Sequence, residues 1–174
     1  MLGLNIFLPL FIHFPLALSS SGVEQGSGMD LPPDAKIKVE TTFKPKTCHD
    51  ESYKGRKLNL HYTAQLFKNN EIFDSSRSRK KPLTYRLGSG GIVKGFDKGL
   101  YNMCIGEKRK ITVPSYLGYG DNELKKNGVV IHSGATLIFE VELFYMRPET
   151  EKVKISGVNE GIHDDDIYSI YSEL

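Results

Sequence analysis

The sequence predicts an α+β fold in which a curved antiparallel β-sheet, a half-barrel, wraps around one short α-helix. Four apolar residues within residues 88–106 recur at spacings of four, four and three, the stripe of an amphipathic helix: Ile92, Phe96, Leu100 and Met103. Gly106 follows as the expected C-terminal stop of this helix. On both sides of it, apolar residues alternate with polar ones, as in strands that bury one face. A single short helix must therefore cover one antiparallel sheet.

The first 18 residues form an apolar run without a charged side chain, with small residues just behind it. This composition is typical of a secretory signal peptide, which we predict over residues 1–20. An uncleaved anchor is the alternative, although Pro9, His13 and Pro15 interrupt a run that is already short for crossing a bilayer. Residues 21–34 are rich in Ser and Gly and indicate a flexible linker.

One folded domain is expected over residues 35–147. Its strands are expected at residues 36–40, 57–66, 83–87, 107–113 and 136–145, with a turn at 68–71 and a charged loop at 75–81. A long segment containing glycines, residues 116–134, separates the last two strands and is interpreted as a functional loop.

Charge is unevenly distributed along the chain. The formal net charge of +2 argues against nucleic acid as the main partner, but residues 56–147 hold 16 Lys and Arg against 8 Asp and Glu, and residues 148–174 hold 2 against 7. We predict that residues 148–174 are an acidic, disordered tail. The basic body is either a solvated surface or a contact for a charged partner. The last four residues, Tyr171 to Leu174, read Tyr-Ser-Glu-Leu, a loose variant of the endoplasmic reticulum retention signal; secretion is the alternative.

The two cysteines, Cys48 and Cys104, lie 56 positions apart without the spacing of a zinc site. In a reducing compartment they would be inert core residues. Because the N-terminus indicates the secretory pathway, we predict that they form a disulfide, which would stabilise the fold by roughly 4 kcal/mol.

No conventional catalytic, phosphate-binding or dinucleotide motif is present, and we expect neither a metal nor a cofactor. His61 lies in the middle of a strand, where a structural hydrogen bond is expected. Asp74 follows Phe73 at the rim of the core, where a carboxylate needs a partner such as Arg77 or Arg79; the pair is either a loop ion pair or part of a site.

Aromatic residues from several elements could line a dry pocket for an apolar group: Tyr62, Phe73, Tyr85, Phe96, Tyr116, Tyr119 and Phe139.

These residues belong to motifs through which the chain resembles the FKBP family of peptidyl-prolyl isomerases, which also bind the macrolides rapamycin and tacrolimus. The motifs keep the family's order and spacing from about residue 36 to residue 147. They are His61-Tyr-Thr, Phe73-Asp-Ser-Ser-Arg77, Leu87-Gly88, Gly95-Phe-Asp-Lys-Gly-Leu100, Gly106-Glu-Lys-Arg-Lys110, Leu117-Gly-Tyr-Gly120 and Ala135-Thr-Leu-Ile-Phe-Glu-Val-Glu-Leu143.

The resemblance implies an FKBP-like half-barrel with a hydrophobic pocket between sheet and helix. The implied pocket walls are Tyr62, Phe73, Tyr119 and Phe139, the floor is Phe96, and the rim is Ile92 and Val93, whose amide binds a ligand carbonyl. Asp74 would accept hydrogen bonds inside the pocket, Arg79 would orient it, and Leu83 and Ile131 would be flanking contacts. Cys48 and Cys104 fall where secretory members of the family carry a cysteine pair.

The implied activity is peptidyl-prolyl cis-trans isomerisation during protein folding in the endoplasmic reticulum lumen, by a monomer without stable membrane insertion. Phe96 stands where the most active members carry Trp, Leu83 where an aromatic is common, and Ile131-His-Ser where the family has Ile-Pro-Pro. We therefore expect modest turnover and weakened macrolide affinity. The alternative is a chaperone or binding module that holds prolyl or apolar segments with little turnover.

Overall fold

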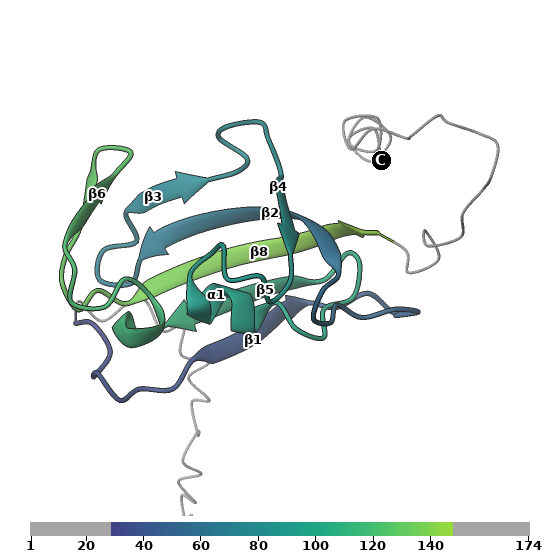
Figure 1. Ribbon diagram of the computed structural model, residues 1–174, viewed down its shortest axis with the longest axis horizontal. Helices are drawn as coiled ribbons and strands as arrows, with labels where there is room; N and C mark the ends of the chain where they lie inside the picture. The colour runs from purple at the N-terminus through teal and green to yellow at the C-terminus, as the bar shows by residue number, and fades with distance from the viewer. Residues whose placement is uncertain (1–28, 148–174) are drawn as a thin grey trace, which may run out of the picture.

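The computed structural model describes residues 29–147, which form an antiparallel sheet curved around one short helix (Figure 1). Strands follow the order β1-β5-β8-β2-β3, and β4 also pairs with β2. Their bounds are β1 Lys38–Phe43, β2 Lys57–Leu66, β3 Ile72–Ser75, β4 Leu83–Arg86, β5 Lys108–Val113 and β8 Leu137–Met146. The predicted α+β class and the curved antiparallel sheet are confirmed.

The long central strands β2 and β8 carry the core. Their residues pair in antiparallel register, with Tyr62 opposite Val141 and Ala64 opposite Phe139, and alternate side chains of β2 are buried. The alternation that predicted these strands is therefore the alternation between the core face and the outer face of the sheet. β1 begins two residues later than expected and continues to Phe43.

The helix is shorter than its apolar stripe suggested. Helix α1 spans Lys94–Gly99, whereas Leu100 and Met103 are fully buried beyond its end. The prediction that Gly106 stops the helix was wrong: with φ at +87°, Gly106 makes the turn into β5, and its N–H donates to the Leu143 carbonyl. The stripe correctly predicted that Phe96, Leu100 and Met103 face the core, whereas Ile92 is partly buried and lines the cavity. The stripe did not predict where the helix ends.

Close contact with β5 fixes the position of the helix. A Cβ on Gly95 would lie 2.3 Å from Val113 Cγ1, and a Cβ on Gly99 would lie 2.5 Å from Ile111 Cδ1. Only glycine lets the helix backbone approach the sheet this closely. In Figure 1, α1 lies in front of β5 on the inner side of the curved sheet.

The sequence had suggested one irregular loop between β5 and β8, but the structure has regular elements there. This segment contains a 3₁₀-helix, η1, at Ser115–Leu117 and a hairpin made of β6, Leu124–Lys126, and β7, Val129–Ile131. Asn127 and Gly128 form its turn with φ of +50° and +88°. Asn-Gly is the residue pair that two-residue hairpin turns favour, so the signal was present in the sequence.

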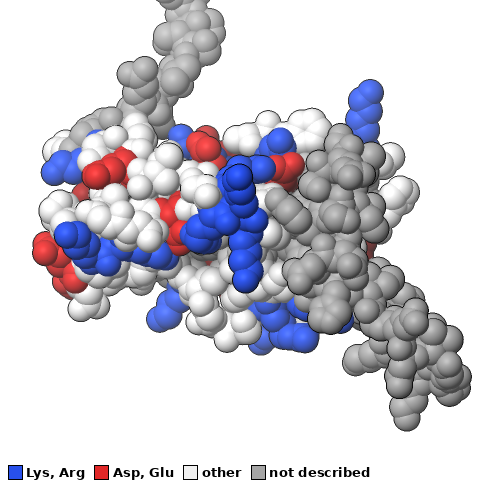
Figure 2. All heavy atoms as spheres, turned by 90° about the horizontal axis from the view of Figure 1, so that it is seen from above, with Lys and Arg blue, Asp and Glu red and all other residues white. Residues whose placement is uncertain are grey.

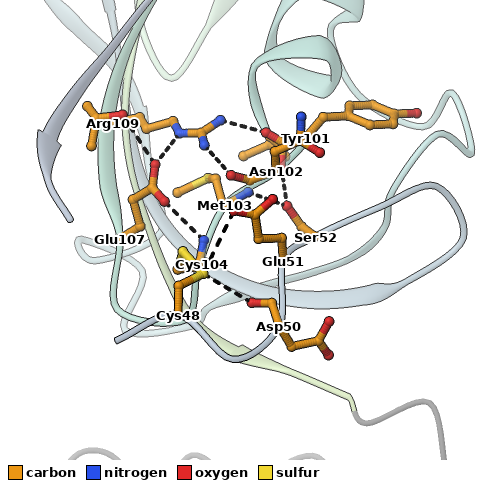
Figure 3. Close-up of a disulfide and its surroundings, with 12 residues drawn as sticks. Cys48, Asp50, Glu51, Ser52, Tyr101, Asn102, Met103, Cys104, Glu107 and Arg109 are labelled. Carbon is orange, nitrogen blue, oxygen red and sulfur yellow. Dashed lines mark hydrogen bonds and ion pairs between the residues drawn. A yellow bond between two sulfur atoms is a disulfide. The ribbon is translucent and has the colours of Figure 1, made fainter. Parts of the chain in front are cut away.

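The predicted disulfide between Cys48 and Cys104 is present, with 5.5 Å between the two Cα atoms (Figure 3). It joins the segment before β2 to the turn before β5. The fully buried Glu107 carboxylate accepts hydrogen bonds from the Cys104 amide, at 3.0 Å, and from Arg109 Nε, at 2.6 Å. Arg109 also donates to the carbonyls of Gly99, Tyr101 and Asn102. The disulfide, the end of α1 and the start of β5 are therefore held together.

Several predictions concern residues outside the described range: the signal peptide, the first part of the linker, the acidic tail and the C-terminal tetrapeptide. The described end of the predicted linker contacts the domain, because Asp30 and Leu31 both form hydrogen bonds with Thr136. Among residues 29–147 there is no helix of the length and apolar character needed to cross a bilayer.

Removal of the disulfide is expected to destabilise the domain. Closing a loop of 56 residues removes unfolded-state entropy worth about 4 kcal/mol. Urea unfolding of the oxidised protein, of the thiol-reduced protein and of the Cys48→Ser, Cys104→Ala double variant measures this loss. A reduced protein within about 1 kcal/mol of the oxidised one would contradict the prediction.

Glu107 is expected to make stability depend on pH in the acid range. Burial raises the pKa of Glu107, but the Cys104 amide and Arg109 outweigh this effect and hold the pKa below its ordinary value of 4.5. The resulting stabilisation is complete above the ordinary value and is lost as pH falls through the lower folded-state pKa.

Urea unfolding at a series of pH values tests this dependence. Glu107→Gln should be less stable than wild type at pH 7, and its deficit should shrink between about pH 5 and about pH 3. Glu123→Gln, at an exposed position, is the matched control and should follow the wild-type profile. A Glu107→Gln deficit that stays constant over this range would count against the assignment.

Candidate active site

A cavity of about 640 Å³ opens between the sheet, the N-terminal side of α1 and the segment after β5. Its walls come from elements distant in sequence. The lining residues are Tyr62 and Ala64 of β2, Phe73 and Asp74 of β3, Leu83 of β4, Gly90 to Lys94, Phe96 of α1, Tyr116, Gly118 to Gly120, Lys126 of β6 and Phe139 of β8.

Stacked aromatic rings form the base of the cavity. The Phe96 ring lies parallel to the Phe139 ring at a centroid distance of 4.5 Å, and the Tyr62 ring tilts against Phe96 at 5.6 Å. Phe73 forms edge-to-face contacts with Phe139 and Tyr119, at centroid distances of 6.5 and 6.4 Å. This is an apolar, rigid surface for a small apolar ring.

One buried carboxylate lies beside these rings. Asp74 is 6% exposed and accepts a hydrogen bond from the Tyr62 hydroxyl at 2.9 Å. Arg79 forms an ion pair with the other carboxylate oxygen of Asp74 and also donates to the Tyr62 hydroxyl at 3.0 Å. Of the two arginines considered from the sequence, Arg79 is the partner of Asp74, whereas Arg77 pairs with Glu142. Asp74 thereby fixes the Tyr62 ring in the cavity wall.

Lys126 is a lining residue that the sequence analysis missed. Its ammonium lies 2.7 Å from Asp74 Oδ2 and 6.0 Å from the centroid of the Phe73 ring. The hairpin that carries it is attached to β3 by a hydrogen bond of 2.8 Å from Asn127 Nδ2 to the Phe73 carbonyl. Lys126 lies beside Asp74 because it belongs to the β6–β7 hairpin. The Asn-Gly turn signal of the hairpin could have indicated this contact.

Two polar groups at the cavity have no partner among the described residues. The Val93 N–H, immediately before α1, donates no hydrogen bond, and the hydroxyl of half-buried Tyr119 neither donates nor accepts one.

Asp97 holds the segment before α1 by accepting from the Gly88 N–H at 2.8 Å and from the Tyr85 hydroxyl at 2.7 Å. Burial and this bond to Asp97 raise the pKa of Tyr85. Tyr85 therefore supports the rim from outside the cavity.

Most of the residues selected from the sequence come together at this cavity. Those that line it are Tyr62, Phe73, Asp74, Leu83, Ile92, Val93, Phe96, Tyr119 and Phe139. Arg79 reaches it through Asp74, whereas Ile131 is fully buried in β7 and does not line it.

His61 lies away from the cavity, with Nδ1 3.1 Å from Ser76 Oγ and its ring stacked on Phe144. Burial, followed by the charge of Arg77, lowers the pKa of His61. These contacts are those of a structural histidine on the outer face of the sheet.

Comparison with known proteins places these features in one family. Residues 48–144 match the family model described as FKBP-type peptidyl-prolyl cis-trans isomerase. FK506-binding protein 2B of Rhizopus delemar is 42% identical over 117 residues, which cover 67% of this chain and 54% of that protein, so the match spans about half of the relative. Peptidyl-prolyl cis-trans isomerase FKBP2 of Homo sapiens is 40% identical over 138 residues, which cover 78% of this chain and 92% of that protein.

A solved structure agrees with this assignment. The structure titled "Crystal structure of AtFKBP13" superposes with a TM-score of 0.56 at 32% sequence identity, covering 64% of this chain and 93% of that chain. The family match, the relatives and the fold all agree with the resemblance seen in the sequence motifs. The chain therefore belongs to the FKBP-type peptidyl-prolyl cis-trans isomerases.

Proposed function

We propose that this chain accelerates cis-trans isomerisation of peptide bonds before proline in polypeptides folding in the endoplasmic reticulum lumen. The observation that carries the proposal is the cavity itself: an apolar base of stacked Phe96 and Phe139 with two unpartnered hydrogen-bonding groups, Val93 N–H and Tyr119 hydroxyl, at its walls. A proline ring fits an apolar base of this kind, and the flanking carbonyls of a peptide need such donors.

The reaction needs no nucleophile. Rotation about a peptide bond meets a barrier of about 18–20 kcal/mol because the planar amide is stabilised by resonance, and isomerisation before proline takes tens to hundreds of seconds without a catalyst. A catalyst has to bind the twisted amide more strongly than either planar form. Binding, orientation and exclusion of water are sufficient for this.

Each part of the site has a role in this mechanism. The proline ring lies on Phe96 between Tyr62, Phe73 and Phe139, where little water can solvate the polar planar amide. The Val93 N–H and the Tyr119 hydroxyl donate to carbonyls on either side of the twisting bond and hold the chain while it rotates. Asp74 and Arg79 position the Tyr62 ring.

The compartment is inferred from three independent features. An apolar N-terminal run without charges is typical of a signal peptide, the Cys48–Cys104 disulfide is stable in an oxidising environment, and the chain ends in a variant of a retention tetrapeptide. Unfolded secretory polypeptides containing proline are accordingly the proposed clients. Rapamycin and tacrolimus are proposed ligands of the same cavity, with affinity reduced by Phe96 at its base.

Isomerisation of a short Xaa-Pro peptide by the oxidised chain, residues 21–174, tests the proposal. Wild type should accelerate the reaction, Asp74→Ala should lose most of the acceleration, and Phe96→Trp should increase it by enlarging the apolar base. Tyr119→Phe should lower kcat/KM about fivefold, the value of one neutral hydrogen bond. Tyr53→Phe, which removes a hydroxyl outside the cavity that accepts a hydrogen bond from Arg56, is its control.

If wild type and Phe96→Trp are both folded and both inactive, the enzymatic proposal fails. Peptide binding without turnover would then replace it with a binding or chaperone module. Loss of retention in cells after deletion of the four terminal residues would support residence in the endoplasmic reticulum, and unchanged retention would oppose that signal.

A further inference from the structure

The mouth of the cavity carries more positive charge than its one carboxylate balances. Arg79 and Lys126 both pair with Asp74, so this cluster holds two cations and one anion. Lys94, exposed at the rim, lines the same cavity and forms no ion pair with any residue from 29 to 147. Within residues 29–147, no other Asp or Glu lines the cavity.

The second cation is not needed to satisfy Asp74. The Tyr62 hydroxyl and Arg79 already provide the buried carboxylate with a hydrogen bond and an opposite charge. An ammonium group has three donors, and one of those of Lys126 is directed at Asp74. The Lys126 and Arg79 side chains are 40% and 47% exposed, so both remain accessible to a ligand that enters the cavity.

The structure holds Lys126 in place at this position. Asn127 attaches the hairpin to β3, and the alternation of strand β6 directs Lys126 into the cavity while Lys125 is exposed and does not line it. Figure 2 shows Lys and Arg side chains gathered on the face that carries the β3–β4 loop, whose basic residues are Arg77, Arg79, Lys80 and Lys81. Figure 2 also shows Asp and Glu side chains on this face, and Arg77 pairs with Glu142. The unbalanced charge at the cavity is therefore that of Arg79, Lys126 and Lys94.

We propose that this cavity prefers prolyl segments with an acidic residue directly beside the proline, and that Lys126 is the residue that determines this preference. The inference rests on the proposed isomerase function and names its substrate class. With the proline ring on Phe96, a carboxylate on a neighbouring residue can reach the free donors of Lys126, with Arg79 and Lys94 adding attraction. A basic residue at the same place is repelled by these charges.

Matched peptides test the preference directly. The oxidised chain, residues 21–174, is assayed with two pairs of peptides. One pair carries Glu or Gln immediately before the proline, and the other carries Glu or Gln immediately after it. In at least one pair, kcat/KM for the Glu peptide should exceed that for the Gln peptide about threefold at low salt. The ratio should approach one near 1 M salt, where screening acts within about 3 Å.

The variants separate specificity from general damage to the site. Lys126→Gln should bring the Glu-to-Gln ratio close to one, and Lys126→Glu should reverse it. Lys125→Gln, one residue away on the same hairpin, removes an equal charge outside the cavity and should keep the wild-type ratio. The ratio is the readout, because a merely structural role of Lys126 would change the rates of both peptides alike.

Failure of this inference differs from failure of the isomerase proposal. If wild type turns over both peptides of each pair equally at low salt, the acidic preference is wrong and the isomerase function stands. If it turns over none of them, the isomerase proposal fails, and the dissociation constants of the same peptides, measured by NMR titration, decide the preference instead. Equal dissociation constants in both pairs would overturn it.

Discussion

The closest approach of helix to sheet determines the shape of the whole site. Gly95 and Gly99 let α1 lie against Val113 and Ile111 of β5, with distances that no side chain at these positions would allow. Phe96, between them, is thereby placed in parallel contact with Phe139 of β8. The base of the cavity, and the rim that precedes the helix, both depend on this contact.

Hydrogen bonds and ion pairs to buried carboxylates also position the elements around the site. The domain buries two carboxylates, Asp74 and Glu107, and each is held by an arginine and by a further donor. Asp74 orients an aromatic wall of the cavity, whereas Glu107 connects the disulfide and the end of α1 to β5 (Figure 3). A buried carboxylate without such partners would destabilise the fold, so each of them specifies how neighbouring elements must meet.

The sequence predicted β1, β2, β4, β5 and β8, and β2 shows the clearest local signal in its alternating burial from Leu60 to Leu66. The short strands β3, β6 and β7 were not assigned residue ranges from the sequence, because runs of three or four residues carry little periodicity. The helix end could not be predicted, because Leu100 and Met103 remain buried after the helical hydrogen bonds have stopped. Lys126 was missed since its contact with Asp74 depends on the β6–β7 hairpin, a tertiary arrangement. The flanking contact that the family motif implied for Ile131 stays a prediction, and the side chain is fully buried in β7.

The central claim is that the proline ring of a client lies on Phe96 at the base of the cavity. Nuclear Overhauser contacts between an isotope-labelled proline in a short peptide and the oxidised protein measure this most directly. We predict contacts from the proline ring to the Phe96 and Phe139 rings, together with exchange between the cis and trans peptide signals that the protein accelerates. Contacts confined to another surface, such as the outer face of the sheet around His61 and Phe144, would contradict the claim.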